Sequence, residues 1–261
     1  MRPVVCGQMI CMPRWAGRLI TAWTLCLAML STPGEAAETV ALSVPSGAEI
    51  VSQRYPAQGP DLLLWFTGQY GRVEAEHDAA ADLAGHGVET WVSDFYVPYF
   101  LPLLPSSVEQ VPDADLAAWL EAVHRRNPGR RLILAAPGHQ AALALRAAQA
   151  GHGVAGALLL FPLLYRDVQP GEMPEYDPVV DRARLDIVIL QPRSAAGYWW
   201  RERLKGRLEA AGSRVRITVL DGLRDGFYRR GDASEQENAA GRRLGAILLD
   251  GLNTLPAAPA Q

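Results

Sequence analysis

The sequence predicts an α/β protein with a mostly parallel central sheet and helices on both faces. Strand-like and helix-like segments alternate from about residue 40 to residue 252, with no internal repeat or low-complexity linker. Several strand-like segments, such as Asp61–Phe66, are continuous apolar runs, as expected of strands that are buried on both faces. Strands that alternate with helices form βαβ units and therefore a mainly parallel sheet. We expect a single domain over residues 37–261.

The first half of the chain opens with two strands that are separated by the turn Pro45-Ser46-Gly47. Asp113 is placed to cap a helix that Asn127-Pro128-Gly129 ends. The strands expected in this half are Val40–Val44, Ala48–Tyr55, Asp61–Phe66 and Val88–Ser93, and the helices are Val73–Ala84 and Asp113–Arg126.

The second half continues the alternation to the end of the domain. Its expected strands are Arg131–Ala136, Val154–Phe161, Leu185–Gln191 and Arg214–Leu220, and its helices are His139–Ala150, Trp199–Ala211 and Ser234–Leu252. Parallel sheets bind ligands at the carboxyl ends of their strands. The segments that follow each strand are therefore where we look for a site.

The N-terminal segment is predicted to be a signal peptide over residues 1–36. Arg2, Arg14 and Arg18 precede an apolar run, Leu19–Leu30, and small residues follow up to a cleavage site after Ala36. We expect a periplasmic or secreted protein without a stable membrane span after cleavage, because the run is shorter than the roughly 20 residues that a span needs. All three cysteines lie in this segment, so the mature chain would contain no thiolate and no disulfide.

The composition excludes several classes of partner. Hydrophobic residues make up 49% of the chain and charged residues 20%, which suits a well-filled core. The net charge of −3 gives no electrostatic reason to expect nucleic acid, and the pairs Arg229-Arg230 and Arg242-Arg243 are interpreted as solvated surface. The five histidines match no metal signature such as H-E-x-x-H, and we expect neither a metal nor a cofactor.

One segment carries a resemblance to a known family. In Leu132–Leu145 an apolar strand, a turn of small residues and an alanine-rich helix resemble the nucleophile elbow of α/β-hydrolases. The segment Trp65–Gly71 stands where that family has its oxyanion loop. The resemblance extends over nearly all of the mature chain and implies an α/β-hydrolase-like fold with a cleft at the elbow.

The residues that would carry hydrolase chemistry depart from the family pattern. The elbow motif G-x-S-x-G places Gly138 at the nucleophile, and a glycine has no nucleophile. Asp225 stands where the family has its histidine, and no histidine follows His152. Aspartate, with an ordinary pKa of about 3.9, cannot accept a serine proton near neutral pH as imidazole does. The acid position, within Gln191–Ala196, contains no carboxylate.

The cleft candidates are residues near the elbow and the two facing loops. We interpret Gly138 as a position that needs a positive φ, and we expect alanine to cost more stability there than at Gly153. His139 is expected to contact a ligand rather than act as a base. The full set of candidates is Gly68, Gln69, Tyr70, Gly138, His139, Gln140, Asp225 and Phe227.

Three functions follow from these observations. We favour a non-catalytic pseudoenzyme that binds a small molecule or an envelope partner in the former active-site cleft. The first alternative is an esterase-type hydrolase with an atypical constellation, built from Ser93 or Ser194 with Asp94, His139 or Asp225. The second alternative is a structural or assembly factor of the cell envelope.

Overall fold

The computed structural model describes residues 37–67, 69–151, 153–166 and 173–256, which belong to one compact unit. The signal peptide predicted over residues 1–36 lies outside the described residues, as do Gly68 and His152. The expectation for Gly68 as a cleft residue therefore stays a prediction.

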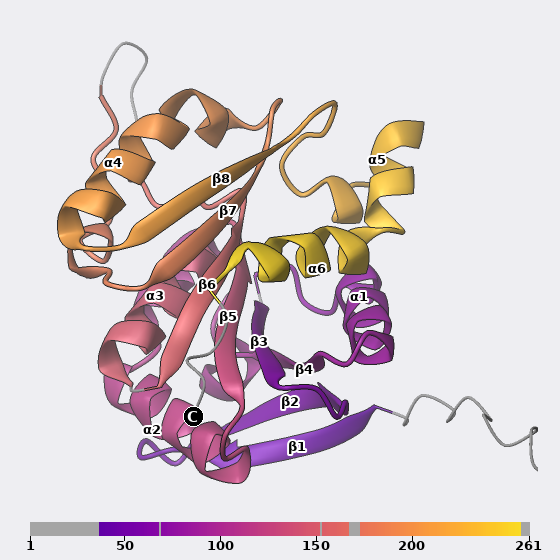
Figure 1. Ribbon diagram of the computed structural model, residues 1–261. Helices are drawn as coiled ribbons and strands as arrows, with labels where there is room; N and C mark the ends of the chain where they lie inside the picture. Colours follow the sequence, from indigo (N-terminus) through magenta and orange to yellow (C-terminus); the bar gives the residue numbers. More distant parts are fainter. Residues whose placement is uncertain (1–36, 68, 152, 167–172, 257–261) are drawn as a thin grey trace, which may run out of the picture. The chain divides into compact units, whose positions relative to one another are not determined.

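Within the described residues, eight strands form one sheet in the order β1-β2-β4-β3-β5-β6-β7-β8 (Figure 1). β1 and β2 form an antiparallel hairpin and β2 runs antiparallel to β4, whereas every other neighbouring pair is parallel. The strands are β1 (Glu38–Ser43), β2 (Glu49–Tyr55), β3 (Asp61–Thr67), β4 (Glu89–Asp94), β5 (Arg131–Pro137), β6 (Val154–Leu160), β7 (Asp186–Pro192) and β8 (Arg214–Leu220). The predicted mostly parallel sheet is confirmed.

Helices cover both faces of this sheet, as predicted (Figure 1). Among the described residues they are α1 (Glu74–Gly85), α2 (Asp113–Arg126), α3 (Gln140–Ala150), α4 (Arg201–Ala211), α5 (Glu235–Gly241) and α6 (Leu244–Thr254). Apolar side chains of α1 and α6 belong to the core on one face, and those of α2, α3 and α4 belong to the core on the other.

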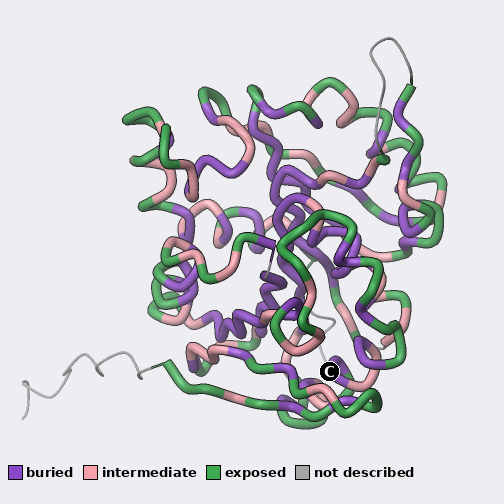
Figure 2. The backbone as a smooth tube through the Cα atoms, turned by 180° about the vertical axis from the view of Figure 1, so that it is seen from behind, coloured by how far each residue is buried: buried purple, intermediate pink, exposed green. Residues whose placement is uncertain are grey.

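Side chains alternate along a buried strand and therefore contribute to the cores on both faces of the sheet. In β3, Leu64 and Phe66 pack on the side of Trp119 in α2, whereas Leu63 and Trp65 pack on the side of α1 and α6. All five side chains are fully buried. Figure 2 shows buried residues mainly in the interior of the molecule and exposed residues mainly on its outer segments. The continuous apolar run of the sequence is therefore explained by burial on two sides.

Two local predictions are wrong. Asp113 does not cap α2: it is the first residue of the helix after Pro112, and its carboxylate accepts a hydrogen bond from Arg146 Nε at 2.8 Å. The predicted helix Ser234–Leu252 is two helices, because the chain turns at residues 242 and 243. Gly241 ends α5 against the backbone of Tyr228, whereas α6 packs on the sheet, and one straight helix could not make both contacts.

The strand order fixes where a ligand can bind. The chain leaves β3 for β4 on one side and then crosses to β5 on the other side of β3. Such a reversal opens a crevice outside the carboxyl ends of the strands. The loop after β3 and the turn after β5 both lie at this point.

Candidate functional site

The turn after β5 has the geometry of an elbow without a reactive side chain. Gly138 has a φ of 55°, which confirms the positive φ predicted from the sequence, and α3 begins two residues later. Its N–H donates to the carbonyl of Leu160 at 2.9 Å, and its own carbonyl accepts from the N–H of Leu163 at 3.0 Å. A Cβ at this position would lie 3.9 Å from the ring of Phe161. The nucleophile position is therefore held by backbone contacts and is chemically silent.

The next two residues of the elbow have different surroundings. His139 is half-buried at the first turn of α3. Gln140 is buried, and its Nε2 donates to the hydroxyl of Tyr96 at 3.0 Å. Burial raises the pKa of Tyr96 to about 12, so this hydroxyl stays protonated. Gln140 therefore anchors the loop after β4.

The loop after β8 carries the position where the resemblance would place a histidine. Asp225 is half-buried there and lines a cavity. Phe227 is only 1% exposed and packs in the core beside α6, so the structure places it under the site rather than in the cleft. Gln69 is buried as well, whereas Tyr70 is 52% exposed and borders the same cavity as Asp225.

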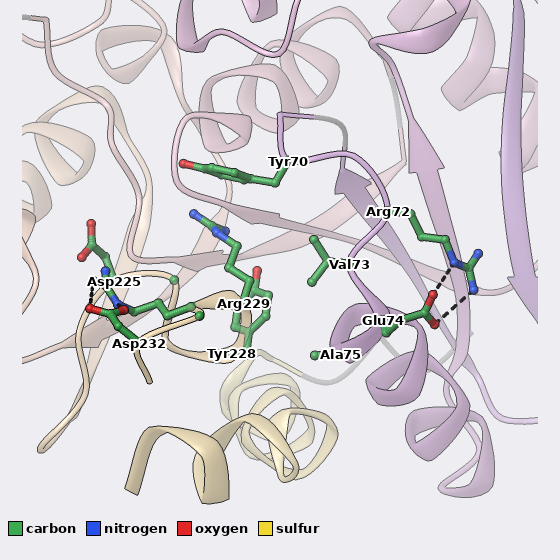
Figure 3. Close-up of a pocket in the computed structure, with 12 residues that line it drawn as sticks. Tyr70, Arg72, Val73, Glu74, Ala75, Asp225, Tyr228, Arg229 and Asp232 are labelled. Carbon is green, nitrogen blue, oxygen red and sulfur yellow. Dashed lines mark hydrogen bonds and ion pairs between the residues drawn. The ribbon is translucent and has the colours of Figure 1, made fainter. Parts of the chain in front are cut away.

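This cavity has a volume of about 810 Å³ and lies between the segment after β3 and the loop after β8 (Figure 3). Tyr70, Arg72 and Glu74 line one side, and Asp225 and Arg229 line the other. The structure thus brings together two of the predicted cleft residues, Tyr70 and Asp225, which are far apart in the sequence. The elbow residues Gly138, His139 and Gln140 do not line this cavity, so their prediction as residues of the same cleft is wrong for it.

Arg229 is one of several residues of the cavity that the sequence did not indicate. Its guanidinium carbon lies 3.7 Å from the ring centroid of Tyr70 and 5.3 Å from that of Phe161. Its Nη1 is buried and has no hydrogen-bond partner. The interpretation of this arginine as solvated surface is therefore wrong. In the sequence, only its position could have indicated a role in the cavity: it lies in the loop after the last strand and follows Phe227 and Tyr228.

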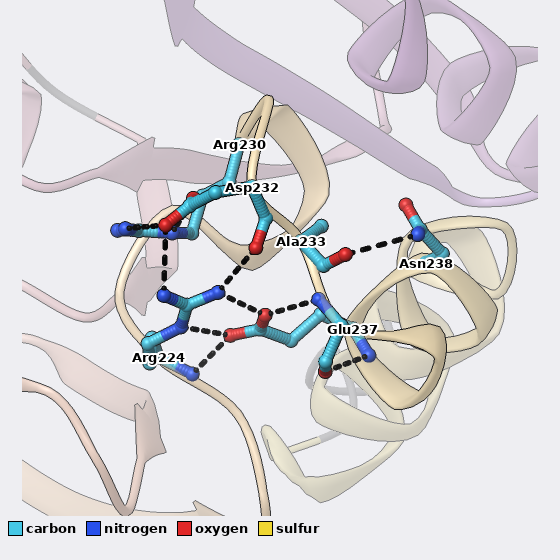
Figure 4. Close-up of polar contacts among 7 residues, drawn as sticks. Arg224, Arg230, Asp232, Ala233, Glu237 and Asn238 are labelled. Carbon is cyan, nitrogen blue, oxygen red and sulfur yellow. Dashed lines mark hydrogen bonds and ion pairs between the residues drawn. The ribbon is translucent and has the colours of Figure 1, made fainter.

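A polar network fixes the loop that carries Arg229 (Figure 4). The Arg224 guanidinium donates to both carboxylate oxygens of Glu237, at 2.8 Å and 2.6 Å, and its Nη1 lies 3.1 Å from Asp232. Glu237 also completes a capping box with Ser234 at the start of α5. The Arg224 guanidinium holds the pKa of Glu237 well below its usual range, so the network is charged at neutral pH.

A second buried carboxyl group lies beneath the cavity. Glu76 in α1 is 3% exposed, and its Oε1 accepts a hydrogen bond from the hydroxyl of Tyr228 at 2.9 Å. Burial raises the pKa of Glu76 to about 7, and the Tyr228 hydroxyl and the Arg229 charge offset only part of this effect. Half of these carboxyl groups are therefore neutral near pH 7.

The two serines considered as nucleophiles of a hydrolase differ in their exposure to solvent. Ser93 is fully buried in β4, and its hydroxyl lies 2.7 Å from the hydroxyl of Ser52. Asp94, next to it, accepts from the backbone N–H of Tyr96 at 2.6 Å and so shapes the following turn. Ser194 is exposed in the turn after β7. Of the two serines, Ser194 alone is open to solvent.

The described part of the chain contains no group of three His, Cys, Asp or Glu residues that could hold a metal ion. In the same part of the chain, no helix has the length and apolar character that a membrane span requires.

Comparison with solved structures places the fold. The esterase of Pyrobaculum calidifontis is 13% identical, with a TM-score of 0.63 and coverage of 86% of this chain and 87% of that one. An α/β hydrolase enzyme from the metagenome of Lake Arreo is 15% identical, with a TM-score of 0.62 and coverage of 85% and 84%. A thermostable carboxylesterase cloned from a metagenomic library is 16% identical, with a TM-score of 0.60 and coverage of 87% and 92%.

No protein-family model matches the chain, and no curated protein matches it. Identities this low show the fold alone. The chain has the α/β-hydrolase fold, as the resemblance at the elbow implied.

Proposed function

We propose that this protein is a non-catalytic member of the α/β-hydrolase fold that binds a small molecule in the cavity at the carboxyl ends of its strands. The observation that carries the proposal is Gly138, which occupies the elbow with a φ of 55° and supplies no nucleophile. An acyl transfer needs a nucleophile and a base within hydrogen-bond reach of each other. Asp225, at the place of the histidine, lines an open cavity instead.

The volume and lining of the cavity support binding over a purely structural role. A site of about 810 Å³ falls in the range of small-molecule pockets. It is bordered by an aromatic ring, Tyr70, and by charged groups of Arg229 and Asp225. A scaffold that acted through its outer surface would have no need for such a lining.

The second candidate is an esterase-type hydrolase. The structural neighbours described above are esterases and hydrolases, and this favours a hydrolase over a non-catalytic protein. In this chain the exposed Ser194 would have to act as the nucleophile, because Ser93 is buried against Ser52. We give it second place because the positions of the fold that carry the chemistry hold Gly138 and Asp225.

Export to the periplasm or the medium remains part of the proposal, on the strength of residues 1–36. An envelope protein is the other partner class that this location would allow. N-terminal sequencing of protein recovered from the envelope should find Ala37 as the first residue, and an intact Met1 would contradict export.

Ester turnover separates the two candidates. The purified protein should hydrolyse p-nitrophenyl acetate and butyrate no faster than a heat-unfolded sample does. Turnover that disappears in Ser194→Ala would overturn the non-catalytic proposal and establish the hydrolase.

A separate experiment tests whether the cavity binds small molecules. In a fragment screen by thermal melting, small molecules should stabilise the wild-type protein, and the shifts should vanish in Val73→Trp, which fills the cavity. Val51→Trp, at an exposed position of β2, is the control and should retain them. Shifts that survive in Val73→Trp would place the binding site elsewhere.

A further inference from the structure

The arginines around the cavity differ in how their charge is compensated. Arg72 donates to Glu74 at 2.7 Å, and Arg230 donates to Asp232 at 2.9 Å. Arg229 forms no ion pair with a carboxylate among the described residues, and its Nη1 is buried without a hydrogen bond. A buried donor of a cationic group that lacks an acceptor costs free energy. The wall of the cavity therefore holds one cation in need of an acceptor.

The nearest buried carboxyl group does not supply that acceptor. Glu76 directs its Oε1 to the hydroxyl of Tyr228, at 2.9 Å. Because burial raises its pKa to about 7, it carries less than a full negative charge at neutral pH. Glu76 therefore compensates the charge of Arg229 only in part.

The packing of Arg229 covers a face of its guanidinium rather than its hydrogen-bonding edge. The guanidinium carbon lies 3.7 Å from the ring centroid of Tyr70, which occupies one face of the cation (Figure 3). The N–H groups of arginine lie in the plane of the guanidinium, so a ring on its face does not consume them. Gly226 makes this placement possible, because a Cβ there would lie 3.0 Å from Nε of Arg229.

We propose that the cavity recognises a small molecule through a single oxyanion group, a carboxylate or a phosphate monoester, that binds the guanidinium of Arg229. This inference rests on the proposed binding function and names its ligand class. Arginine matches both groups in geometry and forms charge-assisted hydrogen bonds with them. Asp225 and Asp232 line the same cavity and disfavour ligands with a second anionic group.

Calorimetric titration of the full chain with three matched ligands tests the inference. Phenyl phosphate and benzoate carry an oxyanion, and benzyl alcohol is their neutral counterpart. We expect at least one of the two anions to bind roughly tenfold or more tightly than benzyl alcohol, and Arg229→Gln to lose this margin. Arg214→Gln removes an arginine that is paired with Asp186 outside the cavity, and should bind as the wild type does.

A second variant covers the case in which Arg229→Gln fails to fold, as judged by its melting curve. Tyr70 is 52% exposed, so Tyr70→Ala should fold normally. It removes the ring that orients the guanidinium and should weaken binding of the anion severalfold.

Co-sedimentation with phosphatidate vesicles adds a lipid-borne source of the same phosphate group. Binding to vesicles but not to phenyl phosphate, with loss in Tyr70→Ala, would assign the oxyanion to a lipid.

The outcomes distinguish this inference from the function on which it rests. Equal binding of benzyl alcohol and the anions, or no binding of any anion or vesicle, would overturn the oxyanion assignment. So would unchanged affinity in folded Arg229→Gln. Release of phosphate from phenyl phosphate would instead overturn the non-catalytic function and leave the anion site in place.

Discussion

The guanidinium carbon of Arg229 lies 3.7 Å from the ring centroid of Tyr70, across the mouth of the cavity. Tyr70 belongs to the segment after β3 and Arg229 to the loop after β8, so the contact joins two loops that are far apart in the sequence. Cation–π contacts of this kind contribute about 0.5–2 kcal/mol. The contact both closes one side of the cavity and orients the cation that faces it.

Gly226→Ala should disturb this contact and weaken the binding of phenyl phosphate. Gly226 has a φ of 63°, and a Cβ there would lie 3.0 Å from Nε of Arg229, so the arginine would have to move. The matched control is Gly222→Ala, at a φ of 73°, where the new Cβ meets Gln236 instead. Both variants should melt at a lower temperature, and titration calorimetry should show weakened binding only in Gly226→Ala. Equal affinities of the two variants for phenyl phosphate would show that Arg229 does not bind the ligand.

Gly138→Ala should destabilise the protein by about 1–3 kcal/mol, because a side chain is strained at a φ of 55°. Gly206→Ala is the control: it lies within α4 with open space around it and should gain up to about 1 kcal/mol. Urea unfolding measures both changes. The smaller cost expected for Gly153→Ala stays a prediction, since Gly153 also has a positive φ, of 79°, and a Cβ there would lie 3.1 Å from the ring of His124. Equal stability of Gly138→Ala and the wild type would show that a side chain at residue 138 is not strained.

Glu76→Gln should stabilise the protein above pH 7. The folded pKa of Glu76 is about 7 and its ordinary value is 4.5, so between these values the folded state holds a proton that the unfolded state has lost. Stability therefore falls as the pH rises through this window, and the loss is complete above it. A glutamine keeps the acceptor for Tyr228 without the charge, and should gain on the order of 3 kcal/mol at pH 8 and nothing at pH 4.

Urea unfolding of wild type and variant at pH 4, 6 and 8 measures this difference. The control is Glu74→Gln, an exposed carboxylate paired with Arg72, which should show no gain at pH 8. Parallel pH profiles for wild type and Glu76→Gln would mean that Glu76 is ionised in the folded state.

The fold could be predicted because its signals are local or periodic. Asp61–Phe66 could be recognised as a buried strand from six residues, and the elbow from a strand, a turn of small residues and a helix. The division of the last helix was missed although Gly241 stands at the break, because a lone glycine also occurs within helices and its contact with Tyr228 could not be foreseen from the sequence. Tertiary contacts decided that boundary.

The site was only half predictable for the same reason. Tyr70 and Asp225 follow strand ends, and the resemblance to α/β-hydrolases at these two loops suggested the cleft. Arg229 looked like one half of an exposed basic pair, and only its placement over Gly226 and against Tyr70 distinguishes it from Arg230. Nothing in the sequence marks Glu76 as buried, because its partner Tyr228 comes from the far end of the domain.

We propose that this protein, which has the α/β-hydrolase fold, binds a small molecule and catalyses no hydrolysis. The most direct measurement is labelling of the full chain with a fluorophosphonate probe, followed by mass spectrometry of the intact protein and its peptides. We expect no adduct at any serine, because Gly138 holds the nucleophile position and Ser93 is buried against Ser52. Stoichiometric labelling of one serine, with Ser194 the exposed candidate, would contradict the account and identify the nucleophile of a hydrolase.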